Sequence, residues 1–252
     1  MRFNLRTVVW IGFLLSTGLF LGGADGAGCG GKSVFESMGD DSTDEAKLEA
    51  ARIALDEGEF SDAVEILADL CGTDLTAPGC DPEAVSLYAS AFAGRAGLDV
   101  FDLIQEAADR TVAPGTSYTL FSSHFSSPDS ADLSDMNSAV LLLLSLPVRT
   151  PDQGLQLAVA TVVDLVVVLG SETGGYGTDG RPNQVPTAAE LDLSVIEGIT
   201  LISRVLRDVN NMSTGLDEAA IGNENISGHI REIQEQLSGA NSTALQTFLG
   251  SI

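Results

Sequence analysis

Apolar residues recur at spacings of three and four along most of the chain, the period of a helix that buries one face. The clearest case is the stretch 42–81, which predicts a helix, a tight turn at 58–60 and a second helix. Ser42 and Glu45 have capping-box spacing, and Gly58 should end the first helix in a left-handed conformation. The expected inner faces are Ala46, Ala50, Ala51, Ile53 and Ala54 in the first helix, and Phe60, Ala63, Val64, Leu67, Ala68 and Cys71 in the second.

A second pair of helices is expected directly after the first. Asp81-Pro82-Glu83 combines an N-cap acid, a proline in the first turn and a carboxylate near the positive end of the helix dipole. The helix that follows should bury Ala84, Val85, Tyr88, Ala91 and Phe92, and a fourth helix is expected at 98–110. The stretch 42–110 therefore predicts two helical hairpins.

The first hairpin resembles a tetratricopeptide-type repeat. That family has a glycine at the turn, an aromatic residue two positions later, a small residue three after that and a large residue further along the second helix; Gly58, Phe60, Ala63 and Leu67 occupy these positions. Alanines replace the family's large aromatic residues on the first helix, and a cysteine loop with Pro78 replaces its terminal proline. The stretch 88–104 also looks like part of uncharacterised helical lipoproteins of Gram-negative bacteria. The resemblance implies stacked helix pairs and no particular activity.

The pattern changes at 112–129, which is rich in Ser, Pro and Gly but holds Tyr118, Leu120, Phe121 and Phe125. Such a loop either folds back on the core or binds a ligand, and we expect the first. Two very apolar helices should follow, at 132–146 and, after a capping box of Thr150 and Gln153, at 155–169. The Val-rich end of the second could form a strand, but its length and its cap favour a helix.

The C-terminal third predicts further helices. Thr187 and Glu190 form another capping box, which should start a long amphipathic helix that buries Leu191, Val195, Ile199, Ile202, Leu206 and Val209. A weaker, more polar helical stretch is expected at 216–237. The predicted fold is thus all-α: one domain over 42–252, with tetratricopeptide-like hairpins at 42–110 and bundle-like helices at 130–240, packed as a bundle or a short solenoid.

The first 41 residues predict export. Arg2 and Arg6 precede an uncharged apolar run at 8–23, which is the layout of a secretion signal, although a single membrane anchor is the alternative. Small residues and then Cys29 follow, which resembles the signal of a bacterial lipoprotein and implies a signal peptide at 1–28, lipidation of Cys29 and a flexible tether at 29–41. Gly26 stands where that family usually has Leu, so cleavage near Ala24 is the competing interpretation. The implied location is the outer membrane, facing the periplasm, or, without lipidation, outside the cell.

Cysteine usage agrees with an oxidising compartment. With Cys29 lipidated, Cys71 and Cys80 form one remaining pair, which can close a short loop as a disulfide. A metal site is not expected, because His124 and His229 lie far from both cysteines in the sequence.

The chain carries 36 Asp and Glu against 12 Lys and Arg, a formal net charge of −24. An acidic surface repels phosphate groups, so nucleic-acid binding is disfavoured. Apolar residues make up 44% of the chain, which is enough for a packed core.

The glycine-rich stretch 170–185 is the most tempting site for a ligand. Its glycines lack the spacing of a phosphate loop, it has no lysine, and its acids lack the spacing of a calcium loop. We expect a flexible connection; if a ligand binds there, Tyr176, Asp179 and Arg181 are the candidate side chains.

No spacing typical of a nucleophile, metal or cofactor site is present, so no catalytic residue and no cofactor is predicted. The favoured function is a non-catalytic envelope lipoprotein that acts as a scaffold or adaptor for another envelope protein. The alternative is a ligand-binding accessory component of a tripartite-type transporter, in which Arg95, Arg181 or Arg204 would line a deep cavity. An unrecognised hydrolase is a weaker alternative, because catalytic residues can assemble from distant positions.

Overall fold

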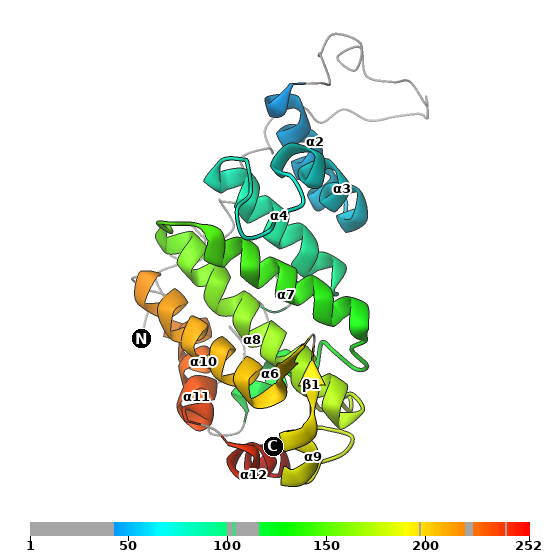
Figure 1. Ribbon diagram of the computed structural model, residues 1–252, viewed down its shortest axis with the longest axis vertical. Helices are drawn as coiled ribbons and strands as arrows, with labels where there is room; N and C mark the ends of the chain where they lie inside the picture. Colours follow the sequence, from blue (N-terminus) through cyan, green and yellow to red (C-terminus); the bar gives the residue numbers. More distant parts are fainter. Residues whose placement is uncertain (1–42, 100–102, 104–115, 197, 220–223, 240) are drawn as a thin grey trace, which may run out of the picture. The chain divides into compact units, whose positions relative to one another are not determined.

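The computed structural model describes residues 43–99, 103, 116–196, 198–219, 224–239 and 241–252. Ten helices and one two-stranded hairpin lie in these residues, which group as one compact unit (Figure 1). The all-α fold is confirmed. The predicted signal peptide, the tether with Cys29 and almost all of the predicted helix at 98–110 lie outside the described residues.

The N-terminal pair is α2 (Asp44–Asp56) and α3 (Phe60–Cys71), joined by a turn in which Gly58 has a φ of 76° as predicted. Two details of the prediction for α2 are wrong. The N-cap is Thr43, whose hydroxyl accepts a hydrogen bond from the Ala46 backbone, so no Ser42–Glu45 capping box forms. Ala50 and Ile53 are exposed, because the buried face turns instead toward Ala51 and Ala54.

The predicted disulfide between Cys71 and Cys80 is confirmed and closes the loop between α3 and α4 (Pro82–Arg95). Asp81 caps α4, and its carboxylate accepts hydrogen bonds from the backbones of Glu83 and Ala84. The predicted inner face of α4 is buried. The disulfide therefore fixes the point at which the chain leaves the first helix pair.

Helix α4 packs against α7 (Ser130–Ser145), and α7 packs against α8 (Pro151–Thr173). The capping box of Thr150 and Gln153 forms as predicted, and 155–169 is helical rather than a strand. Among the described helices, α8 is the one long and apolar enough to cross a membrane, but 78% of its most apolar window is buried. It is surrounded by α7, α10 and α6, as expected for the central helix of a core.

The predicted long helix after Thr187 is wrong. The Thr187–Glu190 capping box forms, but α9 (Ala188–Leu193) is short, and β1 (Val195–Ile196) turns back on β2 (Ile199–Thr200). The turn contains Gly198 with a φ of 85°, a conformation that glycine adopts without strain. Thr200 then caps α10 (Leu201–Glu218), so a separate helix begins after the hairpin, out of register with the apolar stripe predicted from Thr187.

Helices α8 and α10 make the most extensive contact in the described body, and glycines allow it. A Cβ atom on Gly215 would lie 2.6 Å from the Gly154 carbonyl oxygen and 2.7 Å from the Ala158 nitrogen. Arg149, before α8, donates to the Leu143 and Leu146 carbonyls at the end of α7 and pairs with Glu218 at the end of α10. The three helices are thus joined at one end by a single side chain.

The remaining helices are α6 (Ser117–Ser122), α11 (Glu224–Leu237) and α12 (Ser242–Ser251). Helix α6 lies in the stretch predicted as a loop, and its aromatic residues and Phe125 are buried, so the expectation that this stretch folds back on the core is confirmed for the part described. The predicted helix at 216–237 is wrong at its start, since α10 ends at Glu218 and α11 begins at Glu224. Helix α12, capped by Asn241, was not predicted.

Candidate functional site

The structure does not bring the candidate ligand residues of the glycine-rich stretch together. Tyr176 is buried, and its hydroxyl donates to the Val166 carbonyl at 2.7 Å and also bonds the Tyr118 hydroxyl. Burial raises the pKa of both tyrosines, so both keep their protons at neutral pH. Tyr176 therefore belongs to the core.

Asp179 and Arg181 lie on the surface. The Asp179 carboxylate accepts a hydrogen bond from the Arg181 backbone, and the two side chains form an exposed ion pair at 3.5 Å. Exposed pairs of this kind stabilise a turn only slightly. These two residues hold a surface turn and do not form a site with Tyr176.

The glycine-rich stretch is packed rather than free. The Tyr176 backbone donates to the Ser126 carbonyl, and a Cβ on Gly175 would collide with that same carbonyl. A Cβ on Gly180 would lie 2.5 Å from the Thr119 carbonyl oxygen of α6, and Gly177 and Asn183 donate backbone hydrogen bonds within the stretch. The glycines therefore permit close contact with α6 and with the residues before α7.

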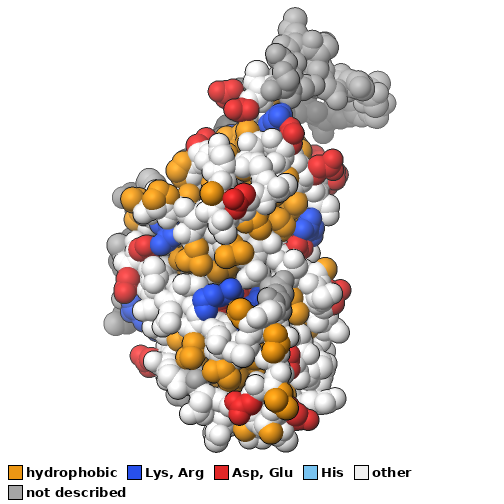
Figure 2. Space-filling view, viewed as in Figure 1, with side chains coloured by type: hydrophobic (Ala, Val, Ile, Leu, Met, Phe, Trp, Pro, Cys, Tyr) orange, Lys and Arg blue, Asp and Glu red, His pale blue; other side chains and the backbone are white. Residues whose placement is uncertain are grey.

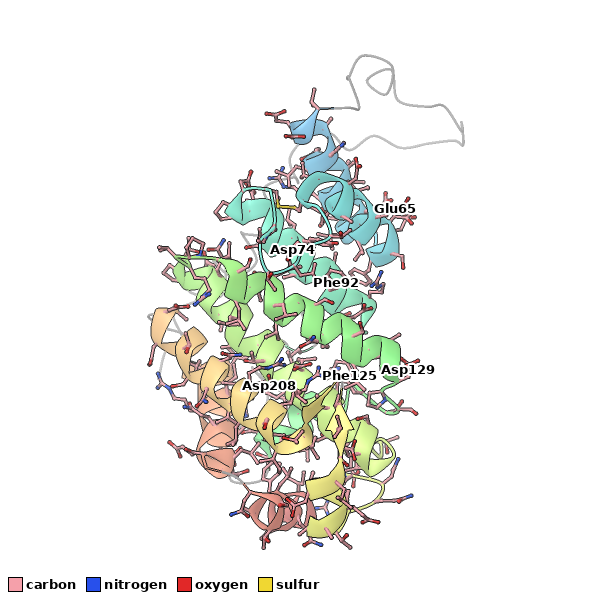
Figure 3. All side chains as sticks on the ribbon, viewed as in Figure 1. Glu65, Asp74, Phe92, Phe125, Asp129 and Asp208 are labelled. Carbon is pink, nitrogen blue, oxygen red and sulfur yellow. A yellow bond between two sulfur atoms is a disulfide. The ribbon has the colours of Figure 1, made fainter. Side chains whose placement is uncertain are left out.

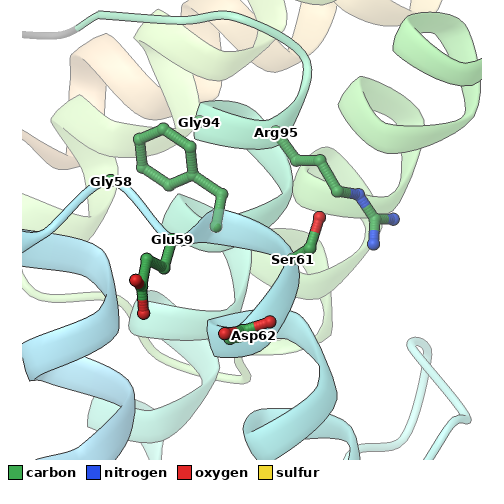
Figure 4. A pocket seen from close by; sticks show the side chains of 7 residues that line it. Gly58, Glu59, Ser61, Asp62, Gly94 and Arg95 are labelled. Carbon is green, nitrogen blue, oxygen red and sulfur yellow. The ribbon is translucent and has the colours of Figure 1, made fainter.

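Arg95 lines a surface hollow of about 350 Å³ together with the α2–α3 turn (Figure 4). The hollow is open to solvent, and Figure 4 shows the Arg95 side chain running away from Gly58 and Glu59. The guanidinium group is engaged elsewhere, since it donates to both carboxylate oxygens of Asp135, at 2.6 and 2.7 Å. The hollow is therefore open, and Arg95, the cation that lines it, is already paired with Asp135.

Arg204 is fully buried and belongs to an ionic cluster between α7, α8 and α10. Its Nη2 atom donates to Asp164 Oδ1 at 2.6 Å and to the Leu133 carbonyl at 3.1 Å. Arg207, which is 28% exposed, donates to Asp164 at 2.8 Å, to Asp208 at 3.0 Å and to Asn137 at 3.0 Å. Asp164 thus receives both guanidinium groups.

Asp208 lies on α10, in the interior of the body (Figure 3). Burial raises the pKa of its carboxyl group well above the ordinary range, and the negative charge of Asp164 raises it further, while Arg207 opposes the shift. Its Oδ2 atom is buried and has no hydrogen-bond partner within the described part of the chain. Asp208 is therefore the group in the cluster most readily held in the neutral form.

A second buried polar pair joins α6 to α11. Ser117 Oγ lies 2.7 Å from His229 Nδ1, and both side chains have no solvent exposure. The distance suits a nucleophile and its base. A substrate, however, would need an opening to the pair, and neither the hollow at Arg95 nor the one beside Cys80 adjoins it.

The most exposed apolar side chains near one another in sequence lie where α9 leads into the β-hairpin. Leu193 is 82% and Val195 is 62% exposed, and Ile199 on β2 is partly exposed. Figure 2 shows apolar side chains over β1 and α9, with acidic side chains beside them. We call Leu193, Val195 and the neighbouring acids Glu190 and Asp192 the hairpin surface.

No protein-family model, curated protein or solved structure matches the chain.

Sequence reasoning missed the ionic cluster and the hairpin surface for different reasons. Asp164 is the one charge within the apolar run 155–169, a signal that could have been noticed. Arg204 and Asp208 lie four residues apart on α10, on the same face as Leu201, Val205 and Met212, a spacing that could have marked both as buried; the transporter alternative instead places Arg204 at a ligand cavity, and Asp208 is not singled out. The hairpin surface carried no such signal, because Val195 continues the apolar helical period of Leu191 and Ile199.

Proposed function

We propose that this protein is a non-catalytic scaffold of the bacterial envelope that binds another protein through the hairpin surface. The observation that carries the proposal is the exposure of Leu193 and Val195, two large aliphatic side chains two residues apart. Exposing them costs hydrophobic free energy of about 1.5–3 kcal/mol each, which a bound partner would recover.

The inner polar groups support binding over catalysis. The ionic cluster is satisfied mainly by its own members and is buried under packed helices. The alternative, a transporter component that binds an anionic ligand, needs an arginine free to face a cavity. Arg204 is enclosed, Arg181 lies on a surface turn and Arg95 is paired with Asp135. These positions favour the scaffold.

Export is supported by two features. The disulfide between Cys71 and Cys80 is typical of proteins that fold in an oxidising compartment. It also leaves Cys29, after the apolar N-terminal run, as the third cysteine. We therefore propose lipidation at Cys29 and attachment to the outer membrane. The tetratricopeptide-type resemblance fits the same proposal, since stacked helix pairs commonly bind proteins.

The test is site-specific photo-crosslinking in the native host. A photoreactive amino acid at position 193 should give a crosslinked band of higher mass, and the same substitution at Val148 is the control. Val148 is 81% exposed and lies between α7 and α8, outside the hairpin surface. Equal crosslinking at both positions, or none at 193, would contradict the proposal.

One observation favours a hydrolase as a second candidate, namely the 2.7 Å approach of Ser117 Oγ to His229 Nδ1. If this pair is catalytic, a fluorophosphonate probe should label the wild-type protein and fail to label Ser117→Ala. Labelling that is absent from the wild type would exclude a reactive Ser117. The lack of any exposure at either residue is why we place this candidate second.

A further inference from the structure

The acids around the exposed aliphatic residues identify the kind of partner that the hairpin surface suits. We propose that its occupant is a cationic, amphipathic segment of another protein, with apolar side chains flanked by Lys or Arg. This inference rests on the proposed function and deepens it.

The hairpin fixes which side chains face outward. Neighbouring residues of a strand point to opposite faces, and Ile196 is buried against the body, so Val195 is directed to solvent. Val195 pairs with Thr200 across the hairpin, so these two residues share the outward face, while Ile199 pairs with Ile196 on the inward face and is only partly exposed. Because one face is held by Ile196 in the core, the outward face is presented on a supported element rather than on a free loop.

The acids beside this face are held in place by neutral donors. Glu190 accepts hydrogen bonds of 2.8 Å from the backbone and from the hydroxyl of Thr187. These bonds lower the pKa of Glu190, first through the backbone donor, so the group is ionised at neutral pH. Asp192 accepts from the Ser242 hydroxyl, which ties α9 to α12. The orientation of both carboxylates is therefore set without a cation.

The local sequence provides no positive charge to balance them. Between Arg181 and Arg204 the chain contains Glu190, Asp192 and Glu197 and no Lys or Arg. A second copy of the chain would bring the same acids to the interface, and with a net charge of −24 on each copy the two would repel. An anionic lipid surface is disfavoured for the same reason. A cationic partner gains both from burying the aliphatic side chains and from the opposite charge.

Synthetic peptides can test this chemistry with the whole chain. Three fluorescent peptides of equal length would be titrated by anisotropy: an amphipathic helix of Leu and Lys, the same helix with Glu in place of Lys, and a Ser and Lys peptide without apolar residues. We expect saturable binding of the Leu and Lys peptide alone, weakening as salt rises from about 0.05 M to about 0.5 M. Equal binding of the Leu and Glu peptide would overturn the proposal.

Two variants separate charge from apolar contact. Glu190→Gln with Asp192→Asn removes both charges but keeps the hydrogen-bond acceptors, and should weaken binding about three- to tenfold. The matched control, Asp56→Asn with Glu57→Gln, removes two exposed charges at the end of α2 and should leave affinity unchanged. Equal losses in the two double variants would show unspecific attraction and overturn the proposal.

Leu193→Ser with Val195→Thr tests the surface itself and should abolish saturable binding, whereas Val148→Ser should not. If Leu193→Ser with Val195→Thr fails to bind but Glu190→Gln with Asp192→Asn binds as the wild type does, the surface is an interface, but the inference that its partner is cationic is wrong. If neither variant changes binding while position 193 still crosslinks in the cell, the inference about partner chemistry fails and the proposed function stands. If position 193 also fails to crosslink, both fail.

Discussion

The two buried carboxyl groups of the ionic cluster, Asp164 and Asp208, have different electrostatic surroundings. Asp164 accepts hydrogen bonds from Arg204 and Arg207, so its negative charge is opposed by two guanidinium groups. Asp208 forms an ion pair with Arg207 at 3.0 Å, and burial disfavours its charge. A buried ion pair is costly to form but even costlier to break on one side, because the remaining charge is left in a medium that solvates it poorly. The two positions should therefore respond oppositely to neutralisation.

We predict that Asp164→Asn lowers the free energy of unfolding by about 3–5 kcal/mol, because it leaves the fully buried Arg204 without its carboxylate. Asp208→Asn should instead raise it near neutral pH, because the amide resembles the protonated carboxyl in shape and charge and, unlike the carboxylate of the unfolded chain, has no charge to give up on folding. Urea unfolding of both variants beside the wild type measures the difference. A loss at Asp208 as large as at Asp164 would mean that Asp208 is ionised in the folded protein.

The raised pKa of Asp208 also predicts a pH dependence with a definite sign. Between the ordinary value of 3.8 and the raised folded value, the folded state binds more protons than the unfolded state. Its contribution to stability is therefore complete below 3.8 and is lost as pH rises through that window, by up to about 1.4 kcal/mol per pH unit.

Asp208→Asn should not lose this contribution, so its stability relative to the wild type should increase from about pH 4.5 to about pH 7.5. Urea unfolding of both proteins across this range measures the difference between their free energies of unfolding. Groups with a lowered pKa, such as Asp74 and Glu190, change stability with pH in the opposite direction, but equally in both proteins, so they do not affect the difference. A constant difference between the two proteins would refute the raised pKa.

At the scale of elements, the contact of α8 with α10 depends on the missing side chain of Gly215. The nearest atoms to an added Cβ are backbone atoms of Gly154 and Ala158, which cannot rotate away. We predict that Gly215→Ala destabilises the protein by about 1–3 kcal/mol through separation of the two helices.

The matched control is Gly250→Ala in α12, where an added Cβ meets nothing within 4 Å. That substitution should be neutral or stabilise by up to about 1 kcal/mol, because alanine loses less backbone freedom in a helix. Thermal unfolding followed by circular dichroism compares the two. Similar melting temperatures for both variants would show that the helices can adjust to the extra methyl group.

Elements whose signals are local could be predicted from the sequence. The caps at Asp81, Thr150 and Thr187 form as expected, because an N-cap depends on a few neighbouring residues. The length of the helix after Thr187 could not be predicted, because Val195 and Ile199 keep an apolar period across the turn at Gly198. Backbone conformation at one glycine decides between a helix and a hairpin there, and the same turn exposes Val195.

For the candidate site, the sequence shows which residue types are present but not which residues lie next to them in the fold. The transporter alternative places Arg204 at a ligand cavity, but the side chain is fully buried and its partner Asp164 is 40 residues away, on another helix. Tyr176 was singled out as a ligand contact, although the packing of α6 encloses it. Long-range packing determines whether a polar side chain faces solvent or the core, and helical spacing alone does not contain that information.

At the scale of the whole molecule, the cysteines link the fold to the proposed location. Cys71 and Cys80 are joined, so Cys29 is the thiol left for a lipid. Each buried methylene of an acyl chain contributes about 0.8 kcal/mol to membrane binding, and the several chains of a lipoprotein anchor make attachment stable. The anchor would hold the helical body near the membrane without requiring α8 to leave the core, where most of its apolar surface is already buried.

We therefore predict that Cys29→Ser moves the protein from the membrane fraction to the soluble fraction of the envelope, with its folded body intact. The double variant Cys71→Ser, Cys80→Ser is the control: it should stay with the membrane, although its free energy of unfolding should fall by about 2–3 kcal/mol because the disulfide is lost. Fractionation followed by immunoblotting measures both. Unchanged fractionation of Cys29→Ser would reject the lipid anchor, and an uncleaved N-terminus found by mass spectrometry would instead favour the apolar run itself as the anchor.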